Sequence, residues 1–242
     1  MNSNQIFNEN CLETMQKMPD GFIQATITSP PYDDLRAYEG YEFDFEAIAK
    51  ELFRVTKDSG VVVWVVGDAT INGSESGSSF RQALYFIELG FRLHDTMIFE
   101  KNSPAFPARK NSNRYTQIFE YMFVFSKGNP KSSLICDKSN KWSGHKDYSG
   151  KLKNPVPDFS PRNNIWKYTT SMNGVKHPAP FPERLAQDHI LTWTDENDLV
   201  FDPFLGSGTT AKMALLNGRF FIGSEISSNY VETARKRIEG LL

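Results

Sequence analysis

The stretch Asp198-Leu199-Val200-Phe201-Asp202-Pro203-Phe204-Leu205-Gly206-Ser207-Gly208-Thr209-Thr210 decides the fold of this chain. Its apolar first half predicts a strand over 198–203, two glycines predict a loop, and a helix is expected after them. Glycine lets a backbone adopt positive φ and approach a ligand closely, and the N-terminus of a helix favours negative charge. The loop lacks the lysine of a phosphate-binding P-loop and departs from the dinucleotide fingerprint.

The next predicted strand, 219–224, ends in the carboxylate of Glu225, 19 residues after Gly206. In nucleoside-binding α/β proteins, an acid at the end of the second strand accepts hydrogen bonds from ribose hydroxyls. A solvated acid at a strand end is the alternative for Glu225. The glycine loop and this acid together predict a site for a nucleoside cofactor.

Strands and helices alternate along most of the chain, which predicts an α/β fold with a mostly parallel sheet and helices on both faces. The 242 residues suit one domain, 1–242. The predicted strands cover 22–27, 61–66, 91–99, 119–125, 198–203 and 219–224. The first predicted helix has Phe45, Ile48, Leu52 and Val55 on one face and ends at 58–60. The next carries Phe80, Leu84 and Ile87 on its apolar face and stops at Gly90, and further helices are predicted over 182–193, 208–217 and 228–240.

Composition narrows the class of protein. No run of 18 apolar residues exists, and the N-terminus lacks a basic region followed by an apolar one, so neither a membrane span nor a signal peptide is expected. The two cysteines, Cys11 and Cys136, match no disulfide or metal pattern. We therefore expect a cytoplasmic protein with no metal site.

Charge is distributed unevenly along the chain. Residues 101–176 contain 14 Lys and Arg against 4 Asp and Glu, a net charge of +10, whereas the remainder carries −12. Aromatic residues lie among these charges, and basic plus aromatic composition is typical of surfaces that hold phosphates and stack on bases. A solvated lysine-rich loop is the alternative. The aromatic candidates are Tyr115, Trp142, Tyr148, Phe159, Trp166 and Tyr168.

A second candidate for a functional element is the loop Thr28-Ser29-Pro30-Pro31-Tyr32, which directly follows the predicted strand 22–27. Two prolines fix φ and remove two backbone donors, so the loop is stiff. Stiff polar loops at the carboxyl ends of strands are where α/β enzymes place their chemistry. Farther along, His177 lies in a proline-rich run before the 182–193 helix, where a structural role is favoured over a catalytic one.

With these motifs in this order, the chain resembles the S-adenosylmethionine-dependent DNA amino-methyltransferases, in particular the permuted group whose catalytic loop precedes the cofactor loop. The matching stretches are 28–32, 120–127, 177–182 and 202–210, together with Glu225. The resemblance implies a Rossmann-like methyltransferase fold with S-adenosyl-L-methionine as cofactor and double-stranded DNA as substrate. It also implies a basic recognition insertion over 127–176. Related enzymes are often homodimers, and many belong to restriction-modification systems with a partner endonuclease.

By the same resemblance, the catalytic residues are Ser29, Pro30, Pro31 and Tyr32. Tyr32 would stack on a base extruded from the duplex, and the Ser29 hydroxyl and Pro30 carbonyl would accept hydrogen bonds from its amine. The implied cofactor-binding residues are Asn10, Cys11, Thr28, Pro180, Asp202, Phe204, Gly206, Ser207, Gly208, Thr209, Thr210 and Glu225. The implied DNA-binding residues are Arg109, Lys110, Arg114, Lys141, Lys146, Lys151 and Lys153.

The sequence is compatible with more than one function. Ser at the first catalytic position more often accompanies cytosine N4 methylation in the family, and Asp accompanies adenine N6 methylation, so Ser29 favours cytosine. Methylation of RNA or of a protein glutamine is an alternative, as is a non-catalytic nucleic-acid-binding module. A nicotinamide-dependent dehydrogenase is disfavoured because it has no use for a Ser-Pro-Pro-Tyr loop.

Overall fold

The computed structural model describes residues 2–31, 43–102, 113–145, 155–169 and 181–241. These ranges contain a central eight-stranded sheet and six α-helices. The helices are α1 (Cys11–Gln16), α2 (Phe45–Val55), α3 (Ser78–Glu88), α4 (Glu183–Trp193), α5 (Thr209–Leu216) and α6 (Ser228–Ile238). The central strands are β1 (Gln5–Phe7), β2 (Ile23–Thr28), β3 (Thr56–Val66), β6 (Arg92–Lys101), β7 (Phe119–Ser126), β10 (Ile165–Tyr168), β11 (Leu199–Asp202) and β12 (Phe220–Ser224).

The sheet has the strand order β1-β12-β11-β2-β3-β7-β6-β10. Strand β7 runs antiparallel to its neighbours β3 and β6, and the other neighbouring pairs are parallel. Strands β2 and β11 are buried along their full length, as expected for parallel strands covered on both faces. The predicted α/β class with a mostly parallel sheet is confirmed.

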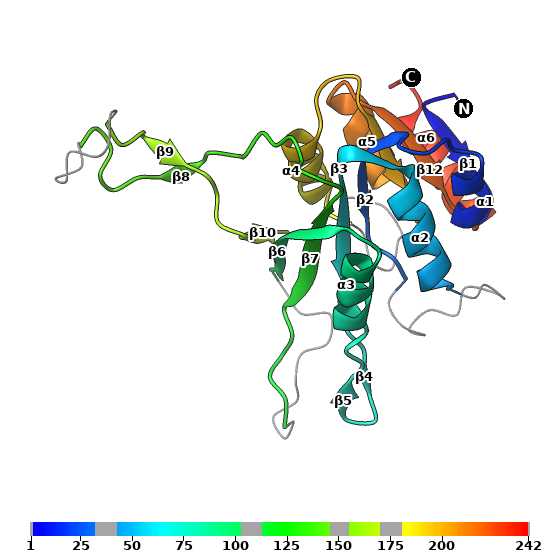
Figure 1. The fold of residues 1–242 in the computed structure, drawn as a ribbon, viewed down its shortest axis with the longest axis horizontal. Coiled ribbons are helices and arrows are strands. Elements are labelled where there is room, and N and C mark those ends of the chain that lie inside the picture. The colour runs from blue at the N-terminus through cyan, green and yellow to red at the C-terminus, as the bar shows by residue number, and fades with distance from the viewer. Residues whose placement is uncertain (1, 32–42, 103–112, 146–154, 170–180, 242) are drawn as a thin grey trace.

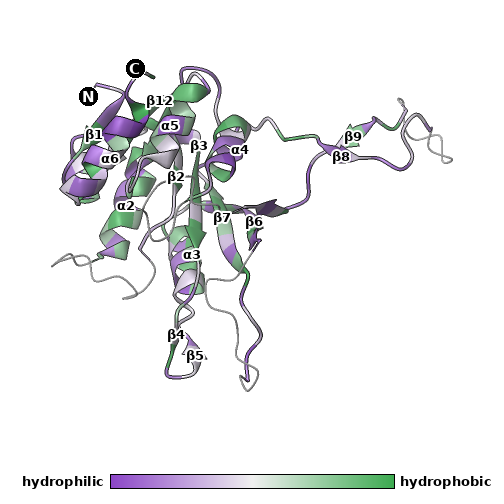
Figure 2. Ribbon diagram, turned by 180° about the vertical axis from the view of Figure 1, so that it is seen from behind, coloured by the Kyte–Doolittle hydropathy of each residue, from purple (hydrophilic) through white to green (hydrophobic). Residues whose placement is uncertain are grey.

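Helices cover both faces of the sheet (Figures 1 and 2). Helices α1, α2 and α3 share one apolar core, which includes Met15, Leu52 and Phe86. Helices α4, α5 and α6 share the core on the other face, which includes Leu185 and Ala211. Within the described ranges, no helix has the length and apolar character needed to cross a bilayer.

The pairing register shows which loops meet at the same end of the sheet. Thr28 at the end of β2 lies beside Trp64, and Val66 at the end of β3 lies beside Tyr121 near the start of β7. The Ser29–Pro31 loop and the segment just before β7 therefore lie at one end, which we call the site end. The small hairpin of β4 (Thr70–Ile71) and β5 (Ser74–Glu75) follows β3 and projects from this end (Figure 1).

A long arm leaves the sheet at the opposite end. It starts after Ser126, which pairs with Val61 and Arg92, and it carries the two-stranded ladder of β8 (Lys138–Ser139) and β9 (Phe159–Ser160). The arm projects sideways from the sheet (Figure 1). It returns as β10, which joins the edge of the sheet beside β6. The predicted strands did not include β10, which lies within the segment 127–176 that was predicted as a recognition insertion.

Two of the aromatic candidates for base stacking are structural instead. Trp166 and Tyr168 lie on β10 and are buried in the core beneath α4. Their burial follows from the pairing of β10 with the sheet, which the charge pattern did not reveal. By contrast, Tyr115, Trp142 and Phe159 are exposed.

A buried ionic cluster fastens the base of the arm to α4. The guanidinium of Arg162 donates to Asp188 Oδ2 at 2.7 Å and also pairs with Asp137 on the arm. The Tyr168 hydroxyl donates to the same Asp188 oxygen at 2.8 Å, and Arg184 Nε lies 2.8 Å from the other oxygen. Asp188 is almost fully buried, so its charge depends on these partners.

Helix α3 forms as predicted and ends before Gly90, but its predicted apolar face is wrong. Phe80, Leu84 and Ile87 are exposed, whereas Ser79, Gln82, Ala83 and Phe86 are buried. The reason lies in specific contacts of the inward face. Gln82 Oε1 accepts a hydrogen bond from Trp64 Nε1 at 2.9 Å, Ser79 Oγ donates to Asp68 at 2.6 Å, and the Phe86 ring stacks on Phe125.

The cluster at Asp188 predicts a clear effect of Arg162→Met. This change removes one partner from a buried ion pair, so the free energy of unfolding should fall by about 3 kcal/mol, and limited proteolysis of the arm should speed up. The matched control is Lys236→Met, which breaks an exposed i,i+4 pair with Glu232 and should change stability little. Equal effects of the two changes in chemical denaturation would contradict the assigned role of Arg162.

Candidate functional site

The centre of the site is a buried hydrogen bond between two neighbouring strand ends. Thr28 at the end of β2 donates its hydroxyl to Asp202 Oδ1 at the end of β11, at 2.7 Å. The two residues are 174 positions apart in the chain and are brought together because β2 and β11 pair in parallel. The bond therefore joins the Ser29–Pro31 loop to the glycine loop that follows Asp202.

Burial sets the charge state of Asp202. Its side chain is nearly inaccessible to solvent, and this burial raises the pKa of the carboxyl from its ordinary value to about 6. Hydrogen bonds from Thr28, Thr210 and the backbone N–H of Phe204 oppose the rise. A buried carboxylate of this kind is well placed to meet a cationic group, because a positive partner would stabilise its charged form.

The glycine loop closes over the ends of β11 and β12. Gly206 and Gly208 both adopt positive φ, at 52° and 84°, and the Leu205 N–H donates to the Ser224 carbonyl at 2.9 Å. A Cβ on Gly208 would lie 2.8 Å from the Cβ of Ala234 on α6. The loop is thus held tightly between strand and helix, with α5 starting directly after it at Thr209.

Glu225 lies on the other side of this loop. One carboxylate oxygen accepts from the Gly206 N–H at 2.8 Å, and the other accepts from the Ser227 N–H at 2.8 Å. Burial raises the pKa of Glu225, and these backbone donors oppose the rise. A carboxylate offers about four lone-pair sites. Two of them shape the loop, which leaves acceptor capacity for a ligand hydroxyl.

Sequence reasoning missed the residues that support the loop from behind. Arg237 on α6 donates to the Ser207 carbonyl at 3.1 Å, to the Ser207 hydroxyl at 2.9 Å and to the Thr209 hydroxyl at 3.0 Å. Glu183 at the start of α4 pairs with Arg237 at 2.6 Å and with Lys212 at 2.7 Å. No motif marks these residues. Arg237 lies within the basic run 235–237, and only Lys212 is an isolated charge on an otherwise apolar helix.

The catalytic-loop candidates lie where β2 ends. Pro30 is buried, and Ser29 and Pro31 are half-buried. Beyond the loop, the ring of Phe204 packs 5.7 Å from Phe43 and 6.3 Å from Trp64, measured between ring centroids. The structure therefore gives the site an apolar wall beside the glycine loop, made in part by the predicted residue Phe204.

The N-terminal candidates Asn10 and Cys11 lie after β1, next to the Glu225 turn. The side chain of the nearby Asn8 donates to the Glu225 carbonyl at 2.9 Å. Asn10 caps α1 through a 2.9 Å bond from the Leu12 N–H, and Cys11 is buried in the core. Both residues therefore have structural roles, and their role in cofactor binding stays a prediction.

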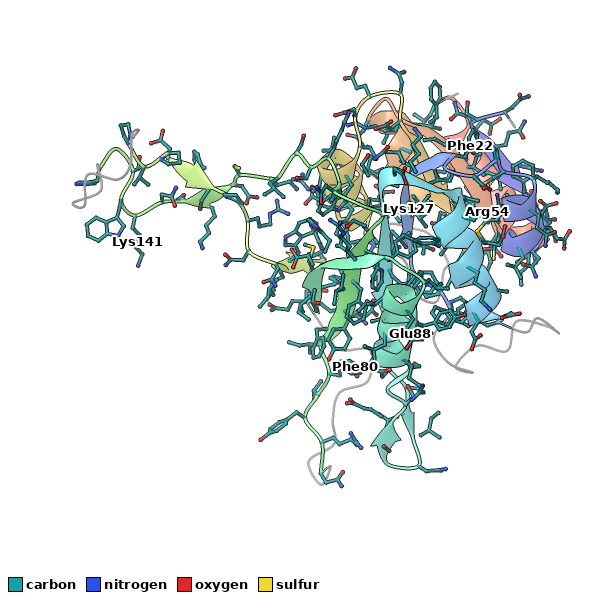
Figure 3. The ribbon with its side chains drawn as sticks, viewed as in Figure 1. Phe22, Arg54, Phe80, Glu88, Lys127 and Lys141 are labelled. Atoms are coloured by element: carbon teal, nitrogen blue, oxygen red, sulfur yellow. The ribbon has the colours of Figure 1, made fainter. Side chains whose placement is uncertain are left out.

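The predicted nucleic-acid contacts are divided between two places. Arg114 lies at the site end, where it pairs with Glu75 and donates to the Gly73 carbonyl of the β4–β5 hairpin. Lys141 lies far out on the arm (Figure 3). The other named candidates lie outside the described residues, namely Tyr32, Arg109, Lys110, Lys146, Tyr148, Lys151, Lys153, His177 and Pro180. Within the described ranges, no group of three metal-ligating side chains is found.

The close packing of the glycine loop can be tested with Gly208→Ala. The change adds both the strain of positive φ, about 1–2 kcal/mol, and a contact with Ala234 that the helix must move to relieve. Gly73→Ala is the matched control, because Gly73 has φ +80° but open space around it. We expect Gly208→Ala to lower the free energy of unfolding by about 1 kcal/mol more than the control. Equal losses in denaturant titrations would show that the contact is unimportant.

Comparisons with known proteins find DNA methyltransferases. The N6_N4_Mtase model, described as DNA methylase, matches residues 23–236. The orphan methyltransferase M.BamHII of Bacillus amyloliquefaciens is 54% identical over 248 residues, which cover 94% of this chain and 92% of that protein. The structure resembles the PvuII DNA methyltransferase, described as cytosine-N4-specific, with a TM-score of 0.77, 24% identity and coverage of 98% and 86% of the two chains. It also resembles the M1.HpyAVI–SAM complex, with a TM-score of 0.67, 26% identity and coverage of 96% and 98%.

The residues present fit S-adenosylmethionine. Gly208 lets the glycine loop pack directly against Ala234 of α6, which holds the loop at the end of β11. Asp202 offers a buried anion for the cationic methionine portion, and Glu225 offers acceptors for ribose hydroxyls. With its family model spanning most of the sequence, the chain belongs to the N6_N4_Mtase family of DNA methylases and is an S-adenosylmethionine-dependent DNA methyltransferase.

Proposed function

We propose that this enzyme methylates the exocyclic N4 amine of cytosine in double-stranded DNA. The observation that carries the proposal is the Thr28–Asp202 hydrogen bond, which fastens Ser29 and Pro30 beside the cofactor loop. Serine at the first position of this loop favours cytosine in the resemblance described above, and the similar PvuII enzyme carries cytosine-N4 in its description. The family also includes N6 enzymes, so adenine N6 is the competing outcome.

The proposed mechanism relies on acceptors rather than on a strong base. The exocyclic amine is a poor nucleophile because its lone pair is delocalised into the ring, and the base must leave the stack before it can react. The Ser29 hydroxyl and the Pro30 carbonyl accept hydrogen bonds from the amine and favour a pyramidal nitrogen. S-adenosylmethionine supplies an electrophilic methyl group on a sulfonium.

Positioning accounts for the remaining steps. The nitrogen lone pair forms the new N–C bond as the S–C bond breaks, and the sulfur keeps that electron pair. The methylated amine is then cationic and acidic, and it loses its proton to water. Asp202 and the Gly206–Gly208 loop would hold the methionine portion of the cofactor, and Glu225 would hold its ribose. Tyr32, the proposed stacking residue, lies outside the described residues.

The two basic regions receive different roles in this proposal. Arg114 and the β4–β5 hairpin lie at the site end and would contact DNA near the extruded base. The arm with Lys141 leaves from the opposite end and projects sideways, so it would contact the duplex farther from that base. Most of these cations would meet phosphates, which position the enzyme without reading sequence. The similar M.BamHII is an orphan methyltransferase, which supports an enzyme that acts without a paired endonuclease.

Nucleoside analysis tests the proposed product. DNA incubated with enzyme and labelled S-adenosylmethionine should yield N4-methylcytosine after digestion, and finding only N6-methyladenine would overturn the choice of cytosine. Ser29→Ala should lose most turnover while keeping affinity for the cofactor, because only an acceptor to the amine is removed. Ser139→Ala, on the exposed strand β8, is the control and should keep full turnover. Unchanged turnover in Ser29→Ala would refute its role.

The raised pKa of Asp202 predicts how cofactor affinity depends on pH. A bound cation favours the charged carboxylate, whereas protonation below about pH 6 competes with binding. Calorimetric affinity for S-adenosylmethionine should therefore fall as pH drops from about 8 to about 5, by at most about tenfold per pH unit below the pKa.

Asp202→Asn isolates this contribution. Its binding should be weak and nearly independent of pH over the same range, because the amide carries no titrating proton. The matched control is Asp158→Asn on the exposed arm, which should keep the wild-type profile. A pH dependence that survives in Asp202→Asn would assign the effect to another group.

A further inference from the structure

The hairpin of β4 and β5 projects from the site end without a core of its own (Figure 1). Thr70 pairs with Glu75 and Ile71 pairs with Ser74, and all four residues are exposed. A two-stranded hairpin of this size is marginally stable in water at best. Its shape therefore depends on the contacts that hold it.

The turn and the base of the hairpin are both fixed. Asn72 and Gly73 have φ of 49° and 80°, and positive φ at both positions is typical of a two-residue type I′ turn. At the base, the Ser76 N–H donates to the Ala69 carbonyl at 2.8 Å, and the Ser76 hydroxyl donates to Asp68 at 3.1 Å. The same carboxylate accepts hydrogen bonds from the first turn of α3, so the hairpin is anchored to that helix.

A side chain from the segment before β7 braces the outer part of the hairpin. Arg114 donates to the Gly73 carbonyl in the turn, and its guanidinium lies 3.8 Å from the carboxylate of Glu75. The pair offsets the negative charge of Glu75, which would otherwise repel phosphates. The hairpin is thus held at its base and at its turn, as a rigid projection.

The hairpin lies close to the loop that carries Ser29. Strands β2 and β3 are neighbours in the sheet and lie about 4.8 Å apart. Ser29 follows directly after β2, and β4 starts at Thr70, soon after β3 ends at Val66. A strand rises about 3.4 Å per residue, so the ribbon extends about 10 Å from Ala69 to its turn at Asn72.

These dimensions suit entry into a DNA groove. The grooves of B-DNA are about 8 Å deep, and the major groove, about 12 Å wide, admits a two-stranded ribbon. The hairpin is therefore long and narrow enough to reach the base pairs of a duplex that presents a base to the neighbouring Ser29 loop.

The tip of the hairpin is suited to the base stack rather than to the phosphates. Its residues Ile71, Asn72, Gly73 and Ser74 carry no charge, whereas phosphate contacts favour Lys and Arg. Ile71 belongs to the ladder pair next to the turn, and 53% of its surface is exposed. A single exposed isoleucine is ordinary by itself. Its place at the tip of a braced hairpin beside the Ser29 loop is what indicates a function.

We propose that Ile71 enters the base stack and fills the gap that the extruded base leaves. Extrusion costs the stacking and pairing of the target base, and an apolar side chain between base steps offsets part of that cost. Ile71 would thereby stabilise the extruded state without touching the reacting atoms. This inference rests on the proposed mechanism, in which the target base leaves the duplex.

The fluorescence of a base analogue tests this role. The methylated site is first mapped with the wild type, and its target base is then replaced by an analogue that stacking quenches, pyrrolocytosine for cytosine or 2-aminopurine for adenine. The wild type should raise the emission. Ile71→Ala should give a smaller rise and, on unmodified DNA, a turnover lower by about tenfold, because less apolar surface is buried in the stack. Ile71→Leu keeps the apolar volume and should keep both values. The matched control is Leu216→Ala, at a similarly exposed residue on α5, which should also keep both.

A mismatched substrate separates this role from a structural one. A mismatched target base is less costly to extrude, so on such a duplex the turnover of Ile71→Ala should come within about threefold of the wild type. Its calorimetric affinity for S-adenosylmethionine should equal that of the wild type, because Ile71 lies outside the proposed cofactor site. A wild type that gives no rise in emission would overturn base extrusion, and the proposed function with it. A full rise with Ile71→Ala, or a deficit that the mismatch does not reduce, would overturn the role of Ile71 alone.

Discussion

The arrangement of this enzyme depends on the parallel pairing of β2 with β11, which the Thr28–Asp202 hydrogen bond closes at the site end. The proposed chemistry depends on the loops that follow these two strands. The loop after β2 carries Ser29 and Pro30, and the loop after β11 carries the glycines that are proposed to approach the cofactor. Because the bond is buried and short, the two loops keep a fixed relation that solvent cannot disturb.

A single helix, α4, supports two other parts of the molecule. Near its start, Glu183 holds Arg237 and through it the glycine loop. One turn later, Asp188 holds Arg162 and through it the base of the arm. Helix α4 thus supports both the glycine loop, which lies at the site end of the sheet, and the arm, which leaves the sheet at the opposite end. Their relative placement is set by packing of α4 rather than by either loop.

The sequence could predict the parts of the site that follow from local pattern. The pattern of strand, glycine loop and acid predicted a site at Asp202, Gly206 and Glu225, and the structure brings these residues together at neighbouring strand ends. The alternation of strands and helices predicted the α/β class. The sequence could not predict Arg237, because the contact of α6 with the loop is a tertiary one without a motif. Periodicity grouped Phe80, Leu84 and Ile87 on one face of α3, but it could not say which face turns inward. Buried partners of Gln82 and Ser79 decided that.

The strand order has a consequence for how the protein is made. During synthesis β2 and β3 appear early, but β11, the other neighbour of β2, lies far along the chain. Until Leu199–Asp202 leave the ribosome, one edge of β2, a strand that is fully buried in the folded protein, is without its native partner and open to pairing with another chain. The enzyme therefore completes its central sheet only late in translation, and the ribosome and chaperones must protect β2 until then.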